Sequence, residues 1–146
     1  MPKKVKRVIV TPDKHFPLHS KPAINVLIKT IHKVKPDAYV DLGDLGEWGS
    51  VSHWQWKKKK RPPLEYQMPA VDKDIEDVNA GLDIIDNALN EVKCTEKYMI
   101  EGNHDEWLDR FVEENPYLKG YKFKDALRLK ERGYKFHPCG TFLKIG

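Results

Sequence analysis

The sequence predicts an α/β fold, in which a mostly parallel sheet is connected by crossover helices. Short β-branched or aromatic runs alternate with segments whose apolar residues recur at helical spacing. The links between them are short, and a strand, helix, strand order of this kind forms right-handed βαβ units with parallel strands. The length of 146 residues corresponds to one domain with a single packed core.

The first βαβ unit is predicted at the amino-terminal end of the chain. Residues 8–10 form a β-branched run that is typical of a buried strand entering a loop. Pro22 begins a helix with one apolar stripe, and Pro36 ends it. Residues 38–42 follow as the second strand, so both strands should run parallel.

A longer crossover and two further elements are predicted next. Residues 46–69 lack periodicity and are rich in Trp, Lys and Pro, which indicates a long, lid-like loop. Between Val71 and Val92 apolar residues alternate at spacings of four and three, which favours a crossover helix over a dimeric coiled coil. Residues 98–100 read as the third strand, and residues 106–114 as a helix.

The remaining segments predict one more helix and two short strands. Residues 123–132 read as a helix, with Gly133 as its left-handed cap. Residues 135–137 and 141–145 have strand character. Together with the parallel strands, these elements complete the predicted α/β domain.

Composition excludes several classes of protein. Hydrophobic residues at 40% and charged residues at 33% are typical of a globular chain rather than a disordered one. The apolar stretches are far shorter than the roughly 20 residues that a membrane span needs, so we expect no membrane segment and no signal peptide. Cys94 and Cys139 lack CxxC spacing, which argues against a zinc ribbon and favours a reducing, cytoplasmic location.

Three polar clusters follow directly on the three predicted parallel strands. They are Asp13-Lys14-His15, Gly43-Asp44 and Gly102-Asn103-His104-Asp105. Ligands of open α/β sheets bind outside the carboxyl ends of the strands, so all three clusters should converge on one crevice. The glycines permit a sharp turn and a close backbone approach directly before two of the candidate ligands.

The side-chain types in these clusters indicate a metal site. Carboxylate oxygen, imidazole nitrogen and amide oxygen without a thiolate suit Mn²⁺, Fe or Zn²⁺. Asp44 belongs to the middle cluster, and a carboxylate there can bridge two cations about 3.5–4 Å apart, as in two-metal hydrolases.

In combination the motifs resemble the signature of the calcineurin-like metallophosphoesterases, over residues 8 to 105. The resemblance implies that Asp13 and His15 bind a first metal, that Asp44 bridges, and that Asn103 binds a second metal. It also implies that His104 contacts the scissile phosphate and, with Asp44, serves catalysis. A complete site of this kind holds two divalent cations, Mn or else Fe or Zn. The implied fold is the amino-terminal half of the family's αββα sandwich.

The sequence departs from the family pattern after Asp105. Nothing there matches the family's lone ligand histidine or its later GHxH motif, and we interpret His137 as a strand or turn residue. We therefore expect residues 1–146 to form a single, incomplete metallophosphoesterase domain that binds metal poorly and turns over weakly or not at all. Such a chain should expose an apolar sheet surface and an open strand edge, which favours a homo-oligomer.

A basic, aromatic segment and the charge distribution bear on the substrate. Lys57, Lys58, Lys59, Lys60 and Arg61 follow two tryptophans, and such surfaces stack bases and neutralise phosphates. The net charge is +9 up to residue 61, −11 over residues 62–118 and +6 beyond. The basic segments form either a phosphate-attracting face or ordinary solvated surface, and residues 57–61 either contact nucleic acid or solubilise a loop.

Two hypotheses for the function follow. The first is an enzyme that hydrolyses a phosphate mono- or diester, with a nucleic acid or nucleotide as substrate, through a metal-activated water. The alternative is a non-catalytic nucleic-acid-binding module, a degenerate or fragmentary relative of the family. Turnover that depends on Asp44 distinguishes the first from the second.

Overall fold

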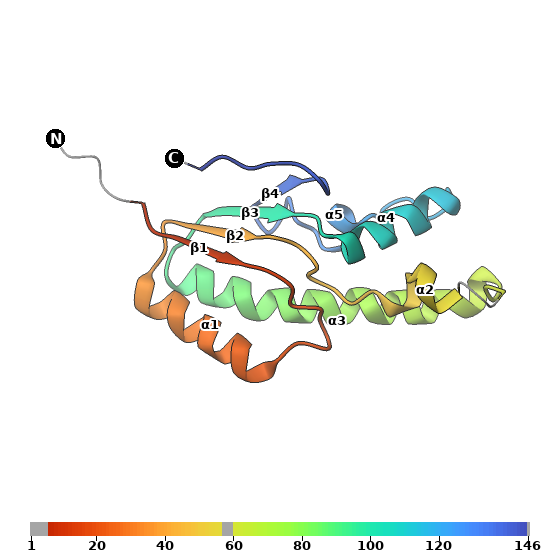
Figure 1. Cartoon of the computed structure of the whole chain (residues 1–146), viewed down its shortest axis with the longest axis horizontal. Helices are drawn as coiled ribbons and strands as arrows, with labels where there is room; N and C mark the ends of the chain where they lie inside the picture. Colours follow the sequence, from red (N-terminus) through yellow and green to blue (C-terminus); the bar gives the residue numbers. More distant parts are fainter. Residues whose placement is uncertain (1–5, 57–59, 146) are drawn as a thin grey trace.

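The computed structural model describes residues 6–56 and 60–145 and contains one four-stranded sheet. The strand order is β1-β2-β3-β4, and every neighbouring pair is parallel (Figure 1). The strands are β1 (Val8–Thr11), β2 (Ala38–Asp41), β3 (Glu96–Ile100) and β4 (Tyr134–His137). The predicted α/β class with a mostly parallel sheet is therefore confirmed.

Two crossover helices cover one face of this sheet (Figure 1). Helix α1 (Lys21–Val34) connects β1 to β2, and helix α3 (Leu64–Glu91) connects β2 to β3. Apolar side chains from the helices and the strands form a single buried cluster between them. The crossover interpretation of residues 71–92 is thus confirmed. The remaining elements are the 3₁₀ turn η1 (Gly49–Val51) and the helices α2 (His53–Trp56), α4 (Asn103–Glu114) and α5 (Phe123–Ala126).

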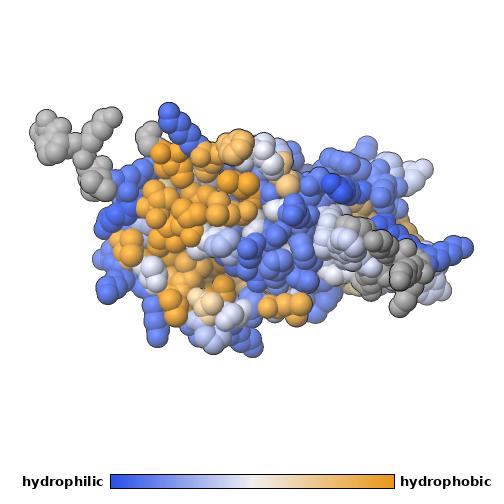
Figure 2. All heavy atoms as spheres, viewed as in Figure 1, coloured by the Kyte–Doolittle hydropathy of each residue, from blue (hydrophilic) through white to orange (hydrophobic). Residues whose placement is uncertain are grey.

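Apolar side chains are also exposed on the outside of the molecule. Figure 2 shows apolar atoms gathered over the half that contains β1, β2 and α1, whereas polar atoms dominate the half with α2 and α4. Val10 is 51% exposed and Leu42 is 45% exposed. Alternation along β1, and its continuation by one residue past the end of β2, place Val10 and Leu42 on the face opposite α1 and α3. Among residues 6–56 and 60–145, no helix is both long and apolar enough to cross a bilayer.

The predicted loop over residues 46–69 is wrong in part, because η1, α2 and the first residues of α3 lie inside it. Helix α3 begins at Leu64 and continues through Pro69, which removes one backbone donor near the amino-terminal end of the helix. The first turns of α3 are nevertheless anchored to η1, because Gln67 Nε2 donates a hydrogen bond of 2.8 Å to the Ser50 carbonyl oxygen. Residues 57–59 lie outside the described part of the chain.

Two carboxyl-terminal predictions also need correction. The predicted helix over residues 123–132 is short, because Arg128 adopts a left-handed backbone with φ 51°, which ends the helical geometry. Residues 141–145 form no strand. Thr141 instead donates from its backbone and hydroxyl group into a turn, and the neighbouring Phe142 side chain is fully exposed.

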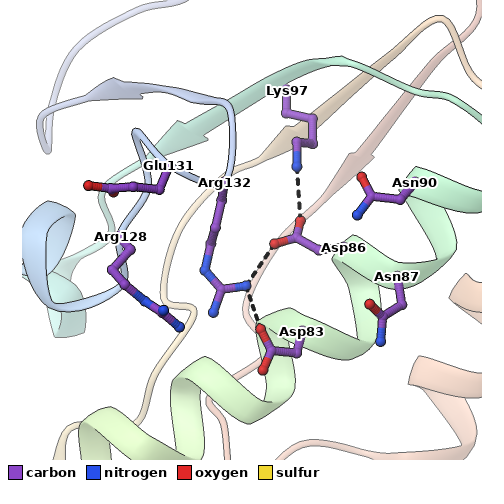
Figure 3. A pocket seen from close by; sticks show the side chains of 8 residues that line it. All are labelled: Asp83, Asp86, Asn87, Asn90, Lys97, Arg128, Glu131 and Arg132. Atoms are coloured by element: carbon purple, nitrogen blue, oxygen red, sulfur yellow. Dashed lines mark hydrogen bonds and ion pairs between the residues drawn. The ribbon is translucent and has the colours of Figure 1, made fainter.

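A buried charge network fastens α3 to the sheet (Figure 3). Asp86 on α3 accepts hydrogen bonds from Lys97 Nζ at 3.2 Å, Arg132 Nη1 at 2.8 Å and Tyr134 Oη at 2.7 Å. Asp83 Oδ1 also contacts Arg132 Nη1 at 2.7 Å. Because Lys97 and Asp86 are almost fully buried, each depends on the other for compensation of its charge.

We predict that Asp86→Asn destabilises the protein by about 3–5 kcal/mol, because it leaves Lys97 buried without a counter-ion. Urea unfolding measures this change. Asp77→Asn is the matched control on the same helix, since the Asp77 partner Lys73 is largely exposed and its ion pair contributes little. Equal midpoints for Asp86→Asn and Asp77→Asn would show that the network does not stabilise the fold.

Candidate metal centre

The loops after β1 and β2 run side by side beyond the ends of their strands. The Asp13 N–H donates to the Gly43 carbonyl at 3.1 Å, and the His15 N–H donates to the Asp44 carbonyl at 2.9 Å. This pairing continues the parallel register of the two strands. The cluster with Asp13 and His15 therefore lies directly beside Asp44.

The turn after β3 meets the loop after β2 in backbone contact. A Cβ atom on Gly43, where φ is 96°, would collide with the Gly102 backbone, and a Cβ on Gly102 would collide with Asp44. Both positions consequently require glycine. Helix α4 begins at Asn103, earlier than the predicted start at residue 106, because Gly102 is its N-cap. The His104 N–H in this first turn donates to Asp44 Oδ1 at 2.9 Å.

Asp105 holds these segments together from inside the protein. Its carboxylate accepts hydrogen bonds from the backbone of Leu45 at 3.3 Å, Gly46 at 3.2 Å and Gly102 at 3.0 Å, and from Trp48 Nε1 at 2.8 Å. Burial raises the pKa of Asp105 to about 6, although the four donors act in the opposite direction. Sequence analysis gave Asp105 no role, since its partners are known only once the loops are placed.

The structure brings together the three residues proposed for the first metal. Ligand atoms of Asp13, His15 and Asp44 all lie within 4.8 Å of one another. Two carboxylates and an imidazole are a donor set that Mn²⁺, Fe and Zn²⁺ accept. All three residues have left-handed backbone, with φ of 47°, 50° and 49°. Non-glycine residues rarely adopt this conformation, so the fold holds these side chains at a conformational cost.

Glu47 is a component of the site that sequence analysis missed. Its Oε2 accepts from His15 Nδ1 at 2.9 Å, and its backbone carbonyl accepts from His104 Nδ1 at 3.0 Å. Because both acceptors lack a proton, each Nδ1 carries a hydrogen, and in the neutral form of each ring Nε2 has the lone pair. A carboxylate on Nδ1 is the usual support of a histidine that binds metal through Nε2. The one available signal was an acidic residue three positions after Asp44.

His104 and Asn103 lie next to this group, in the first turn of α4. The His104 ring meets His15 edge to face at 4.7 Å and stacks on Trp107 at 3.9 Å, with 27° between the planes. Asn103 is exposed, and its Oδ1 accepts a weak hydrogen bond from Cys139 Sγ at 3.8 Å. The third cluster therefore reaches the same end of the sheet as the other two.

Of the basic residues proposed to bind substrate, the structure describes Lys60 and Arg61, and Arg61 does not contact this centre. Lys57, Lys58 and Lys59 lie outside the described residues, and Lys60 is exposed. Arg61 Nη1 contacts Glu114 Oε2 at 2.6 Å, at the last residue of α4. The metal-site residues lie at the first turn of that helix, which at 1.5 Å per residue is about 16 Å away.

The interpretation of His137 as a strand residue agrees with the structure. His137 is the last residue of β4, and its carbonyl accepts the Glu101 N–H at 2.9 Å. Glu101 itself is buried near the acidic side chain of Asp109, and its Oε1 accepts the Cys139 N–H at 3.4 Å. Burial and this acidic neighbour raise the pKa of Glu101 to about 9, so its carboxyl group stays protonated at neutral pH.

This raised pKa predicts a pH dependence of stability. The folded chain keeps the Glu101 proton up to about pH 9, whereas the unfolded chain releases it above about pH 4.5, so the free energy of unfolding falls between these values. Glu101→Gln mimics the protonated carboxyl group, so this variant should lose less stability than the wild type as the pH increases. Urea midpoints at about pH 6 and about pH 8.5 test this, and parallel losses in both proteins would contradict it.

The comparison with known proteins identifies one family. A family model for calcineurin-like phosphoesterases matches residues 6–143. No curated protein and no solved structure matches the chain. The match covers all three polar clusters and all four strands of the sheet. The chain belongs to the calcineurin-like phosphoesterase family.

Proposed function

We propose that this chain is a metal-dependent phosphoesterase that hydrolyses a mono- or diester of a nucleotide or nucleic acid. The observation that carries the proposal is the convergence of Asp13, His15 and Asp44 within 4.8 Å. The alternative, a non-catalytic nucleic-acid-binding module, needs no such convergence of metal ligands. The family match supports the same reaction class.

The carboxylate, imidazole and amide groups of the site suit divalent cations. We propose Mn²⁺ as the bound metal, with Fe or Zn²⁺ as alternatives. Asp13 and His15 would hold one cation, Asp44 would bridge, and Asn103 would offer its amide oxygen to a second. Bound cations of this kind lower the pKa of water and neutralise charge on phosphoryl oxygens. Glu47 fixes the tautomer of His15 and so keeps Nε2 ready to bind.

His104 would act on the phosphate ester itself. Its Nδ1 donates to the Glu47 carbonyl, so Nε2 is the ring nitrogen left for the substrate. In the protonated ring, Nε2 can contact a phosphoryl oxygen or give its proton to the leaving oxygen. The positive end of the α4 dipole lies in the same turn and favours an anion there.

The basic residues between positions 57 and 61 extend the proposal to the substrate. Lys60 is exposed, and with Lys57, Lys58 and Lys59 it forms a run of four positive charges beside two tryptophans. Such a run attracts phosphates of a nucleic acid in a salt-dependent manner. Arg61 contributes less to this attraction, because its guanidinium group already pairs with the Glu114 carboxylate.

Hydrolysis of bis-p-nitrophenyl phosphate tests the function. We expect weak turnover that depends on added Mn²⁺ and falls at least about 100-fold in Asp44→Asn, since a bridging ligand is lost. Asp77→Asn is the control, because this residue lies on α3 and contacts only Lys73 among the described ion pairs. Salt-sensitive nucleic-acid binding without any turnover would refute the enzyme and support the binding module.

A further inference from the structure

A cavity of about 250 Å³ lies between α2 and α4, beside the candidate metal centre. Its lining combines two indole rings with one guanidinium group. The lining residues are Trp54, Asn103, Glu106, Trp107 and Arg110. Trp54 is 62% exposed, and so is the Arg110 side chain, so a ligand can reach both side chains from solvent.

The position of the cavity ties it to the proposed reaction. Trp107 forms part of its wall and stacks on the His104 ring at 3.9 Å. Asn103 also lines the cavity and is the candidate ligand of the second metal. A phosphate ester held at His104 would therefore have this cavity within reach of one of its substituents.

The charges of the cavity favour an uncharged planar group over a second phosphate. Arg110 Nη2 contacts Glu106 Oε1 at 3.2 Å, so the two charges in the lining compensate each other. Indole and guanidinium planes stack well on flat rings of any nucleobase. The Asn103 amide and the Glu106 carboxylate add hydrogen-bonding groups that suit the polar edge of a base.

We infer that this cavity binds the base of the nucleoside whose sugar carries the scissile phosphate. This inference rests on the proposed phosphoesterase function. Trp54 would stack on one face of the base, and the Arg110 guanidinium would lie beside the base. The substrate would accordingly be a nucleotide ester rather than a phosphorylated sugar or alkyl phosphate. Trp107 would contribute to base binding and hold the His104 ring in place.

Two substrates that differ only in the base test the inference. The first is the methyl ester of thymidine 5′-phosphate, and the second is the same diester with hydrogen in place of thymine. Phosphorus NMR follows both reactions with Mn²⁺ and the whole chain. We expect wild type to favour the thymidine ester in kcat/KM by about 5- to 150-fold, the range typical of stacking on one base.

Variants of Trp54 assign this preference to the cavity. Trp54→Ala should bring the ratio of the two kcat/KM values close to one, and Trp54→Phe should keep most of it, since Phe still offers a ring. Tyr117→Ala is the control, because Tyr117 is an aromatic residue that is 96% exposed and lies outside the cavity. A ratio that Trp54→Ala leaves at the wild-type value overturns the inference.

The test separates failure of the inference from failure of the function. Hydrolysis of both esters with equal kcat/KM in wild type overturns the nucleobase subsite and leaves the phosphoesterase standing. Hydrolysis of neither ester refutes the phosphoesterase. Calorimetric binding of thymidine 5′-phosphate then decides the subsite alone: affinity weakened by Trp54→Ala supports it, and equal or absent affinity overturns it.

Discussion

The candidate centre depends on a single buried carboxylate, that of Asp105. Its four hydrogen bonds join the loop after β2 to the turn before α4, two segments about 60 residues apart in the sequence. Burying this carboxylate is costly, and the raised pKa of about 6 reflects that cost. Because one carboxylate accepts from donors on both segments, it favours one arrangement of the two.

The chemistry of the site follows from that arrangement. Once the two segments meet, Asp44 receives the His104 N–H, and Glu47 lies between two imidazole rings. The parallel pairing of the first two loops then supplies Asp13 and His15. The fold therefore places carboxylate, imidazole and amide oxygen or nitrogen ligands at the carboxyl end of the sheet. Asp13, His15 and Asp44 adopt the unfavourable left-handed backbone conformation in this arrangement, which costs conformational free energy.

The sequence was sufficient for the parts of the fold that topology determines. Parallel strands end at one edge, so clusters after residues 11, 41 and 100 had to converge. Glu47 was beyond reach, because its contact with His15, 32 residues away, depends on the register in which two loops pair. The early start of α3 was missed since Pro69 disfavours a helix locally, whereas contacts such as Gln67 with η1 stabilise it. Residues 141–145 have strand propensity, but propensity alone provides no neighbouring strand to pair with.

Calorimetric titration of Asp105→Asn with Mn²⁺ tests the role of this carboxylate most directly. The account predicts a chain that stays folded by circular dichroism and binds Mn²⁺ about 10- to 100-fold more weakly, because an amide NH₂ group then faces backbone donors. Asp105 touches no candidate ligand atom through its side chain, so the loss would report the positioning of the loops. Unchanged Mn²⁺ affinity in the folded variant would contradict the claim that Asp105 organises the centre.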